Sequence, residues 1–272
     1  MKQMTLAVLV ALLLCAAFPA SALVERSMEL NAAFSMLEEG NPFLARYNEI
    51  TGANVKARFP LGVPYFYGGR DEDKLLTLSY TSDFSKNFVE GKQYIYGFDC
   101  SGFTNWINFE TGKPQHDTLE HMITNRGLYG RNQLNTKGIP YDLLYQTLRV
   151  GDFLVANAGS RHIMMYIGTL SDFGYTAADA PELAEYLTCP LLVHCGLCPP
   201  YGERYQAYID ANGLHCNTTD GGVSITIVGI PASDAPHYVH ADHYDHYYFD
   251  LDGYFLRIYD LENASSYVWF RM

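Results

Sequence analysis

Positive charge is scarce in this chain. Its 272 residues include 18 Lys and Arg against 30 Asp and Glu, which gives a formal net charge of -12 with neutral histidines. An acidic surface repels phosphate backbones and anionic lipid headgroups, so nucleic acid and anionic membranes are not expected as partners. A substrate that is uncharged or of mixed charge remains compatible with this composition.

Long apolar runs are missing after the first residues. An apolar run over residues 6–18 follows Lys2 and is followed by the small residues 20–22. This pattern is typical of a secretory signal peptide, and the run is shorter than the ~20 residues that a membrane-spanning helix needs. We therefore expect a signal peptide over residues 1–22 and a mature protein that is secreted, periplasmic or bound to the cell wall, without membrane insertion.

Cysteines are few, and one of the six, Cys15, lies in the predicted signal peptide. Apart from Cys100, the mature chain would keep four cysteines: Cys189, Cys195, Cys198 and Cys216. Export permits disulfides, and four cysteines allow three pairings that sequence cannot distinguish. The spacing of Cys195 and Cys198 also suits zinc or a redox pair, but no second matching pair accompanies it, which favours disulfides.

Internal repeats and low-complexity linkers are absent, and 48% of the residues are hydrophobic. These features indicate one globular domain with insertions. Periodicity predicts helices over 28–52, from Cys100 to about Glu110, and over 141–148. It predicts strands over 152–156, 162–167, 191–195, 223–230, 254–259 and 267–270. Helices that precede strands indicate an α+β fold, with helices packed on an antiparallel sheet.

The most informative segment surrounds Cys100. Gly97 precedes the cysteine by three residues, and Phe103, Trp106 and Ile107 follow with helical spacing. This pattern predicts a sharp turn into a helix whose first turn carries a thiol. A helix N-terminus bears about half a positive charge, which lowers the pKa of a thiol and favours the nucleophilic thiolate. Cys100 is therefore a candidate catalytic nucleophile.

A nucleophilic cysteine needs a base and a group that orients the base. Two of the nine histidines lie in strand-like contexts after the Cys100 helix. His162 opens one apolar strand, and His194 lies near the end of the next. Since adjacent antiparallel strands bring side chains together, His162 can serve as the base and His194 as the residue that orients it.

Four segments occur in the order of the NlpC/P60 family, and the chain resembles a cell-wall endopeptidase of that family. They are residues 64–69, 97–103, 148–153 and 162–168. The resemblance covers about residues 60–196 and extends to the strand predicted over 254–259. It implies a papain-like NlpC/P60 fold with a central antiparallel sheet. It also implies an exported thiol protease, a hydrolase that cleaves peptidoglycan stem peptides near D-glutamate and a diamino acid, without a cofactor.

The resemblance also implies roles for individual residues. Cys100 would be the nucleophile, His162 the general base and His194 the residue that orients it. Tyr65 would help to bind the tetrahedral oxygen. Asp99 and Ser101 would contact the free amine and backbone of the substrate.

Compared with the family pattern, the chain is expected to have an extension before the catalytic domain and insertions within it. Residues 23–59 form a helical N-terminal extension, and residues 60–272 form the catalytic domain. Insertions are expected at about 70–96, 169–188 and 199–250. No cell-wall-binding repeat is visible at either end of the sequence.

Other readings of the sequence stay open. The same catalytic residues would serve an amidase or acyltransferase that acts on a substrate outside the wall. A non-catalytic wall-binding or metal-binding protein is a further alternative, because His237, His240, His243 and His246 recur at a spacing that places ligands on one helical face. A tyrosine- and histidine-rich loop explains the same run, so no metal site is assigned.

Overall fold

The computed structural model describes residues 24–80, 89–115, 133–135, 146–156, 162–179, 181–197, 210–211, 221–229, 237–239, 245–251, 253–259 and 267–270. Within them the chain is α+β, as predicted. Three α-helices come before most of the strands: α2 (Met28–Ser35), α3 (Pro42–Thr51) and α4 (Cys100–Glu110). Two short 3-10 helices also occur: η1 (Glu72–Lys74) and η3 (Pro181–Tyr186).

The strands form a large sheet and a separate hairpin within the described residues. The hairpin pairs β1 (Leu78–Tyr80) with β2 (Gln93–Ile95). The large sheet has nine strands in the order β3-β11-β4-β5-β6-β7-β10-β9-β8. Its members are β3 (Gln133–Asn135), β4 (Phe153–Ala156), β5 (Ile163–Thr169), β6 (Pro190–Leu197), β7 (Gly221–Val228), β8 (His237–Val239), β9 (Asp245–Leu251), β10 (Tyr254–Tyr259) and β11 (Tyr267–Phe270). Every neighbouring pair is antiparallel except β7 and β10, which run parallel.

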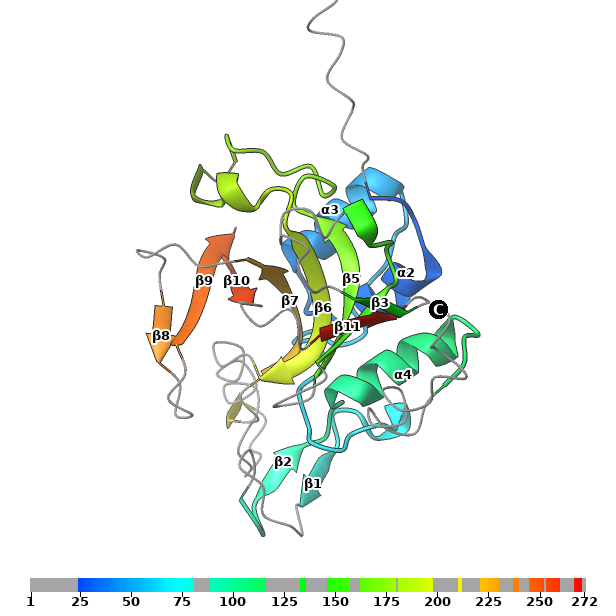
Figure 1. The fold of residues 1–272 in the computed structure, drawn as a ribbon. Helices are drawn as coiled ribbons and strands as arrows, with labels where there is room; N and C mark the ends of the chain where they lie inside the picture. The colour runs from blue at the N-terminus through cyan, green and yellow to red at the C-terminus, as the bar shows by residue number, and fades with distance from the viewer. Residues whose placement is uncertain are drawn as a thin grey trace, which may run out of the picture.

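The central strands are buried on both faces. Alternate residues of β5, β6 and β7, among them Met165, Val193 and Ile225, belong to the hydrophobic core that also contains α2, α3 and α4. The residues between them point to the other face and are buried too, which places His194 and Ser224 on that face. Figure 1 shows the three helices gathered on one flank of the sheet, with β8, β9 and β10 at the opposite flank and the β1–β2 hairpin beyond α4.

The helix predicted over residues 28–52 is two helices. Gly40 adopts a φ of 82°, which ends the first segment, and the Asn41 side chain accepts hydrogen bonds from the N–H groups of Phe43 and Leu44. Pro42 then occupies the first turn of α3, where its missing N–H costs nothing. The prediction of one continuous helix was wrong because an Asn cap followed by Pro marks a new helix start.

Most of the remaining predicted elements are present in the structure, and the others differ or lie outside the described residues. The helix from Cys100 to Glu110 and all six predicted strands are present, with bounds that differ by up to two residues. The described residues of the insertion expected at 169–188 form turns and the 3-10 helix η3. Most of the helix predicted over 141–148 lies outside the described residues, as do the signal peptide and much of the insertion predicted over 199–250.

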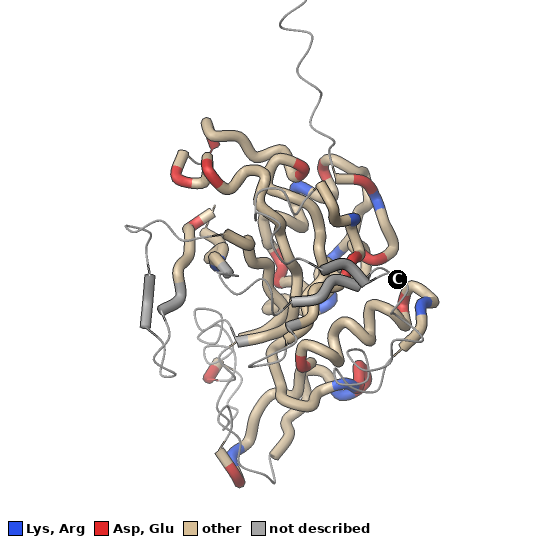
Figure 2. Tube along the Cα trace, viewed as in Figure 1, with Lys and Arg blue, Asp and Glu red and all other residues tan. Residues whose placement is uncertain are grey.

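No helix among the described residues has the length and apolar character required to cross a bilayer. Acidic positions outnumber basic ones along the described chain, as Figure 2 shows, in keeping with the net charge of -12.

Candidate active site

Helix α4 begins at Cys100 because Asp99 caps it. The Asp99 backbone is extended, with φ of -86° and ψ of 179°, and its carboxylate accepts a hydrogen bond from Gly102 N at 2.6 Å. Aspartate is among the residues that best satisfy the unpaired N–H groups of a first helical turn. The cap fixes the Cys100 thiol at the first position of the helix, where it is partly exposed.

Glycines allow three segments to pack against one another behind the thiol. A Cβ on Gly97 would overlap the Pro64 carbonyl oxygen, one on Gly69 would overlap the Gly97 carbonyl, and one on Gly102 would overlap the Gly69 carbonyl. Backbone hydrogen bonds join the same segments, from Phe98 N to Pro64 O at 3.1 Å and from Asp99 N to Gly69 O at 3.0 Å. The glycines of the two motifs are therefore required by backbone contact, which fixes Tyr65 relative to Cys100.

His162, directly before β5, and His194, within β6, form a pair. Nε2 of His162 lies 2.9 Å from Nδ1 of His194, and the rings meet edge to face at an interplanar angle of 90°. Gly196, two residues after His194, leaves room for the pair, since a Cβ there would lie 2.9 Å from Cε1 of His162. The predicted association of the two histidines is therefore present in the structure.

Both histidines are held in the neutral form. Burial, with the positive charge of Arg257 on β10, lowers the pKa of His162 to about 4. Burial also lowers the pKa of His194 well below its ordinary value, and the charges of His162 and Arg257 act in the same direction. A neutral imidazole can accept a proton, so His162 has the protonation state that a general base requires near neutral pH.

The thiol does not have the lowered pKa that its helix position predicts. Burial, followed by the negative charge of Asp99, raises the pKa of Cys100 to about 12. The nearby backbone N–H groups of Ile163, Ser101 and Cys100 itself favour the thiolate and oppose this rise in pKa, but they do not outweigh it. Desolvation therefore exceeds the helix-dipole effect, and the resting site contains a neutral thiol and a neutral imidazole.

Cys100 and the histidine pair meet at the beginning of β5. The backbone N–H of Ile163, the residue after His162, is near enough to the Cys100 thiol to lower its pKa. No hydrogen bond joins the thiol to a ring nitrogen of His162 among the contacts of these two described residues. Since His194 occupies Nε2 of His162, Nδ1 is the nitrogen left to accept the thiol proton, and such contacts commonly tighten when substrate binds.

Tyr65 lies beside the nucleophile. Its backbone N–H donates to Gly221 O at 2.9 Å, and residue 65 forms a bridge with Phe98. Burial raises the pKa of the Tyr65 phenol above its ordinary value, and the charges of Cys100, when its thiol is ionised, and of Asp99 raise it further. The phenol therefore keeps its proton and can donate a hydrogen bond to an oxygen that develops negative charge.

Asp99 and Ser101, predicted to contact substrate, have partners within the protein. Ser101 is 3% exposed, and its hydroxyl donates to Asp99 Oδ1 at 2.8 Å. It also accepts a hydrogen bond from Nη2 of Arg70 at 2.9 Å. Their contact with substrate stays a prediction, while Arg70 is a neighbour of the site that the sequence patterns did not single out.

No group of three or more His, Cys, Asp or Glu side chains able to hold a metal occurs in the part of the chain that the structure describes. His240 and His243 lie outside that part, and the side chains of His237 and His246 are not described. The backbone of β8 and β9 pairs Tyr238 with His246 in an antiparallel arrangement. The helical-face argument for a metal is therefore wrong where the run is described.

Cys195 lies beneath the site and carries a free thiol. Its sulfur lies 3.1 Å from the Phe98 carbonyl oxygen, and its side chain is fully buried. The expectation that disulfides use all four non-catalytic cysteines is therefore wrong for Cys195. Cys198 and Cys216 lie outside the described residues.

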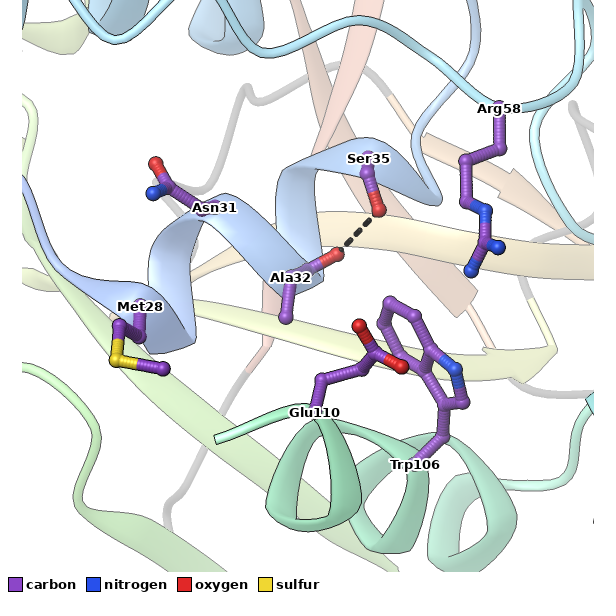
Figure 3. A pocket seen from close by; sticks show the side chains of 7 residues that line it. All are labelled: Met28, Asn31, Ala32, Ser35, Arg58, Trp106 and Glu110. Atoms are coloured by element: carbon purple, nitrogen blue, oxygen red, sulfur yellow. Dashed lines mark hydrogen bonds between the residues drawn. The ribbon is translucent and has the colours of Figure 1, made fainter. Parts of the chain in front are cut away.

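A pocket of about 330 Å³ lies between α2 and α4, away from the histidine pair. Figure 3 shows Trp106 and Glu110 rising from α4 toward α2, with Arg58 at one end. Arg58 forms an ion pair with Glu72, and Nε1 of Trp106 donates to the same carboxylate at 2.9 Å. These contacts connect η1 to α4, and none of the predicted site residues lines the pocket.

Three residues of the site escaped the sequence patterns: Gly196, Arg257 and Arg70. Only Gly196 carried a usable signal, because a glycine inside a strand often marks a close approach of other groups. Comparison of the chain with protein-family models, with curated proteins and with solved structures finds no match. The resemblance to the NlpC/P60 family therefore depends on the four sequence segments alone.

Proposed function

We propose that this protein is an exported, papain-like cysteine hydrolase that cleaves amide bonds in peptidoglycan stem peptides. The observation that supports it most is the arrangement around Cys100: a thiol at the start of α4, near the backbone N–H of Ile163, and a neutral His162 one residue before Ile163 that is paired with His194 at 2.9 Å. A thiol, a base and a group that orients the base are the parts that nucleophilic acyl transfer requires.

The reaction begins when a peptide carbonyl carbon approaches the Cys100 sulfur. Because the resting thiol is neutral, proton transfer to Nδ1 of His162 accompanies formation of the sulfur–carbon bond. His162 then donates to His194 through Nε2, which stabilises the imidazolium and holds the ring in place. The proton on Nδ1 next passes to the leaving amine, which departs and leaves a thioester on Cys100.

Hydrolysis of the thioester uses the same residues, with water as the nucleophile and the Cys100 sulfur as the leaving group. His162, neutral again, removes a proton from water, and the resulting oxygen attacks the thioester carbonyl. Tyr65 and the Cys100 backbone N–H donate to the carbonyl oxygen as it gains charge in both steps; one such donor commonly accounts for a 100- to 1,000-fold rate effect. The acid product leaves, and the proton on Nδ1 returns to the sulfur.

Mass spectrometry of peptidoglycan stem peptides incubated with the protein tests the proposal. Purified stem peptides are incubated with the mature protein, with Cys100→Ala, and with Cys189→Ala as a matched control that removes a distant cysteine. New fragments with the wild type and with Cys189→Ala, but not with Cys100→Ala, support the proposal and identify the bond. Absence of fragments with the wild type excludes this substrate class and directs the search to other amides and acyl acceptors.

A further inference from the structure

Three polar atoms on the buried second face of the sheet have no hydrogen-bond partner. They are Nε2 of His194, Oγ of Ser224 and Oγ1 of Thr226. Their residues are 1%, 1% and 0% exposed. A buried polar group without a partner destabilises the folded state by about 1–3 kcal/mol, so three such groups on one face require a physical explanation.

Two of these atoms belong to directly opposed residues. β6 and β7 are antiparallel, and their register places His194 opposite Ser224 and Leu192 opposite Thr226. Opposed side chains stand on the same face with Cβ atoms about 4.5–5.5 Å apart. Ser224 therefore faces His194, whereas Thr226 lies two positions away, between Leu192 on β6 and Arg257 on β10.

The chemistry of the pair determines what His194 must do at Nε2. If His162 accepts the thiol proton at Nδ1, its Nε2–H must donate to His194, so Nδ1 of His194 is the acceptor. A neutral imidazole carries one proton, and that proton then lies on Nε2 of His194. The two nitrogens of an imidazole point in different directions, and the strand that flanks β6 on the side opposite β5 is β7.

We propose that Ser224 is a positioning residue for the His162–His194 pair: its hydroxyl accepts a hydrogen bond from Nε2 of His194, directly or through one water molecule. A rotation about χ1 of Ser224 that turns the hydroxyl toward this nitrogen would give both unpartnered atoms a partner. The bond fixes the Nε2–H tautomer of His194 and so keeps Nδ1 available to His162. This role rests on the proposed function only in that His162 serves as the base.

The structure offers a matched pair of substitutions. Ser224→Ala removes the acceptor opposite His194. Thr226→Val removes an equally buried, equally unpartnered hydroxyl that lies opposite Leu192 and Arg257 and not opposite His194. Ser224→Thr keeps a hydroxyl at the same position. Loss of an unpartnered hydroxyl is not expected to unfold the protein, and thermal unfolding of each variant checks this.

The first measurement needs no substrate. Long-range ¹H–¹⁵N NMR of the histidine side chains reports which ring nitrogen of His194 is protonated. We expect the Nε2–H form in the wild type, in Thr226→Val and in Ser224→Thr, and a mixture of tautomers in Ser224→Ala. A wild type with the proton on Nδ1, or an unchanged tautomer in Ser224→Ala, overturns the proposal.

The second measurement is the rate of peptide cleavage. We expect Ser224→Ala to lower kcat about tenfold, the effect of one lost hydrogen bond, with KM unchanged and with recovery in Ser224→Thr. Equal losses in Ser224→Ala and Thr226→Val would indicate a packing effect and overturn the proposal. Should no peptide be cleaved by the wild type, the proposed function fails, and the NMR result still decides the role of Ser224.

Discussion

Gly196 lies against the imidazole ring of His162. A Cβ atom on residue 196 would stand 2.9 Å from Cε1 and 3.2 Å from Nε2 of that ring, and 3.0 Å from Nδ1 of His194. Real Cβ atoms do not approach other heavy atoms this closely, and His194 is 1% exposed, so its ring has little room to move aside. The absence of a side chain on residue 196 is therefore part of what holds the histidine pair together.

Gly196→Ala should consequently separate the two rings. We expect peptide cleavage to fall at least about tenfold, because a base that is misplaced by less than 1 Å loses much of its effect. Gly52→Ala is the matched control: Gly52 has a φ of 67° with nothing within 4 Å of its Cβ position, so the substitution strains the α3 terminus without reaching the site. Equal activity of both variants, at matched thermal stability, would contradict this account.

The charge of Asp99 has a separate and measurable effect on the nucleophile. Burial and then Asp99 raise the pKa of Cys100, so Asp99→Asn should lower that pKa while the asparagine side chain still caps α4. A larger thiolate fraction at a given pH means faster reaction with iodoacetamide. We expect faster alkylation of Cys100 in Asp99→Asn between pH 7 and 9, and no change in Asp73→Asn, which alters an exposed carboxylate of η1.

The wild-type alkylation profile provides a further check on the same electrostatics. With a Cys100 pKa near 12, the rate should climb steadily between pH 6 and 9 without a plateau. A plateau that begins near neutral pH would show a stable thiolate–imidazolium pair and contradict the neutral resting state.

The sequence predicted the position of α4 correctly but predicted the wrong direction for the pKa shift of the Cys100 thiol. An Asp cap and apolar residues at helical spacing are local signals, and α4 begins and ends where they indicate. The pKa of Cys100 depends instead on how segments far apart in sequence bury it, because desolvation opposes the helix dipole. A local sequence pattern indicates the helix dipole but not the burial of the thiol. The predicted pKa shift of Cys100 therefore had the wrong direction.

The same distinction explains which strands were found. β5 and β7 are buried along their whole length, and their apolar, β-branched sequences are visible without knowledge of the fold. β8 and β9 contain Tyr, His and Asp residues and exist through pairing with each other and with β10. Arg257 was missed for a related reason, since only the pairing of β10 with β7 brings it near the histidine pair.

The two neutral histidines should make the fold sensitive to mild acid. The pKa of His162 is about 4 in the folded protein against an ordinary 6.5, and that of His194 is also lowered. The unfolded chain binds protons on both groups before the folded chain does, so stability is full above pH 6.5 and is lost as the pH falls toward 4. Each histidine contributes a slope of up to about 1.4 kcal/mol per pH unit.

Urea unfolding at pH 7, 6 and 5 measures this slope. We expect the double variant His162→Gln, His194→Gln to lose less stability between pH 7 and 5 than the wild type. Glu29→Gln is the control. Burial raises the pKa of Glu29, but its ion pair with Lys113 outweighs this effect and lowers the pKa below its ordinary value of 4.5. Glu29 therefore titrates below the pH range of the measurement. Identical slopes in the wild type and the double variant would mean that the pair is already protonated or solvated when folded.

Tyr65 allows the proposed chemistry to be tested at a single atom. The Tyr65 phenol is buried beside Cys100 and keeps its proton, whereas the Tyr67 side chain, two residues on, is 62% exposed. Tyr65→Phe removes a donor to the developing oxyanion, so kcat should fall about 100-fold with little change in KM, because this hydrogen bond forms mainly in the transition state. Tyr67→Phe should leave both constants unchanged. A Tyr65→Phe variant that loses affinity while kcat stays constant would instead make the phenol a substrate contact, and the backbone N–H of Cys100 would then be the principal oxyanion donor.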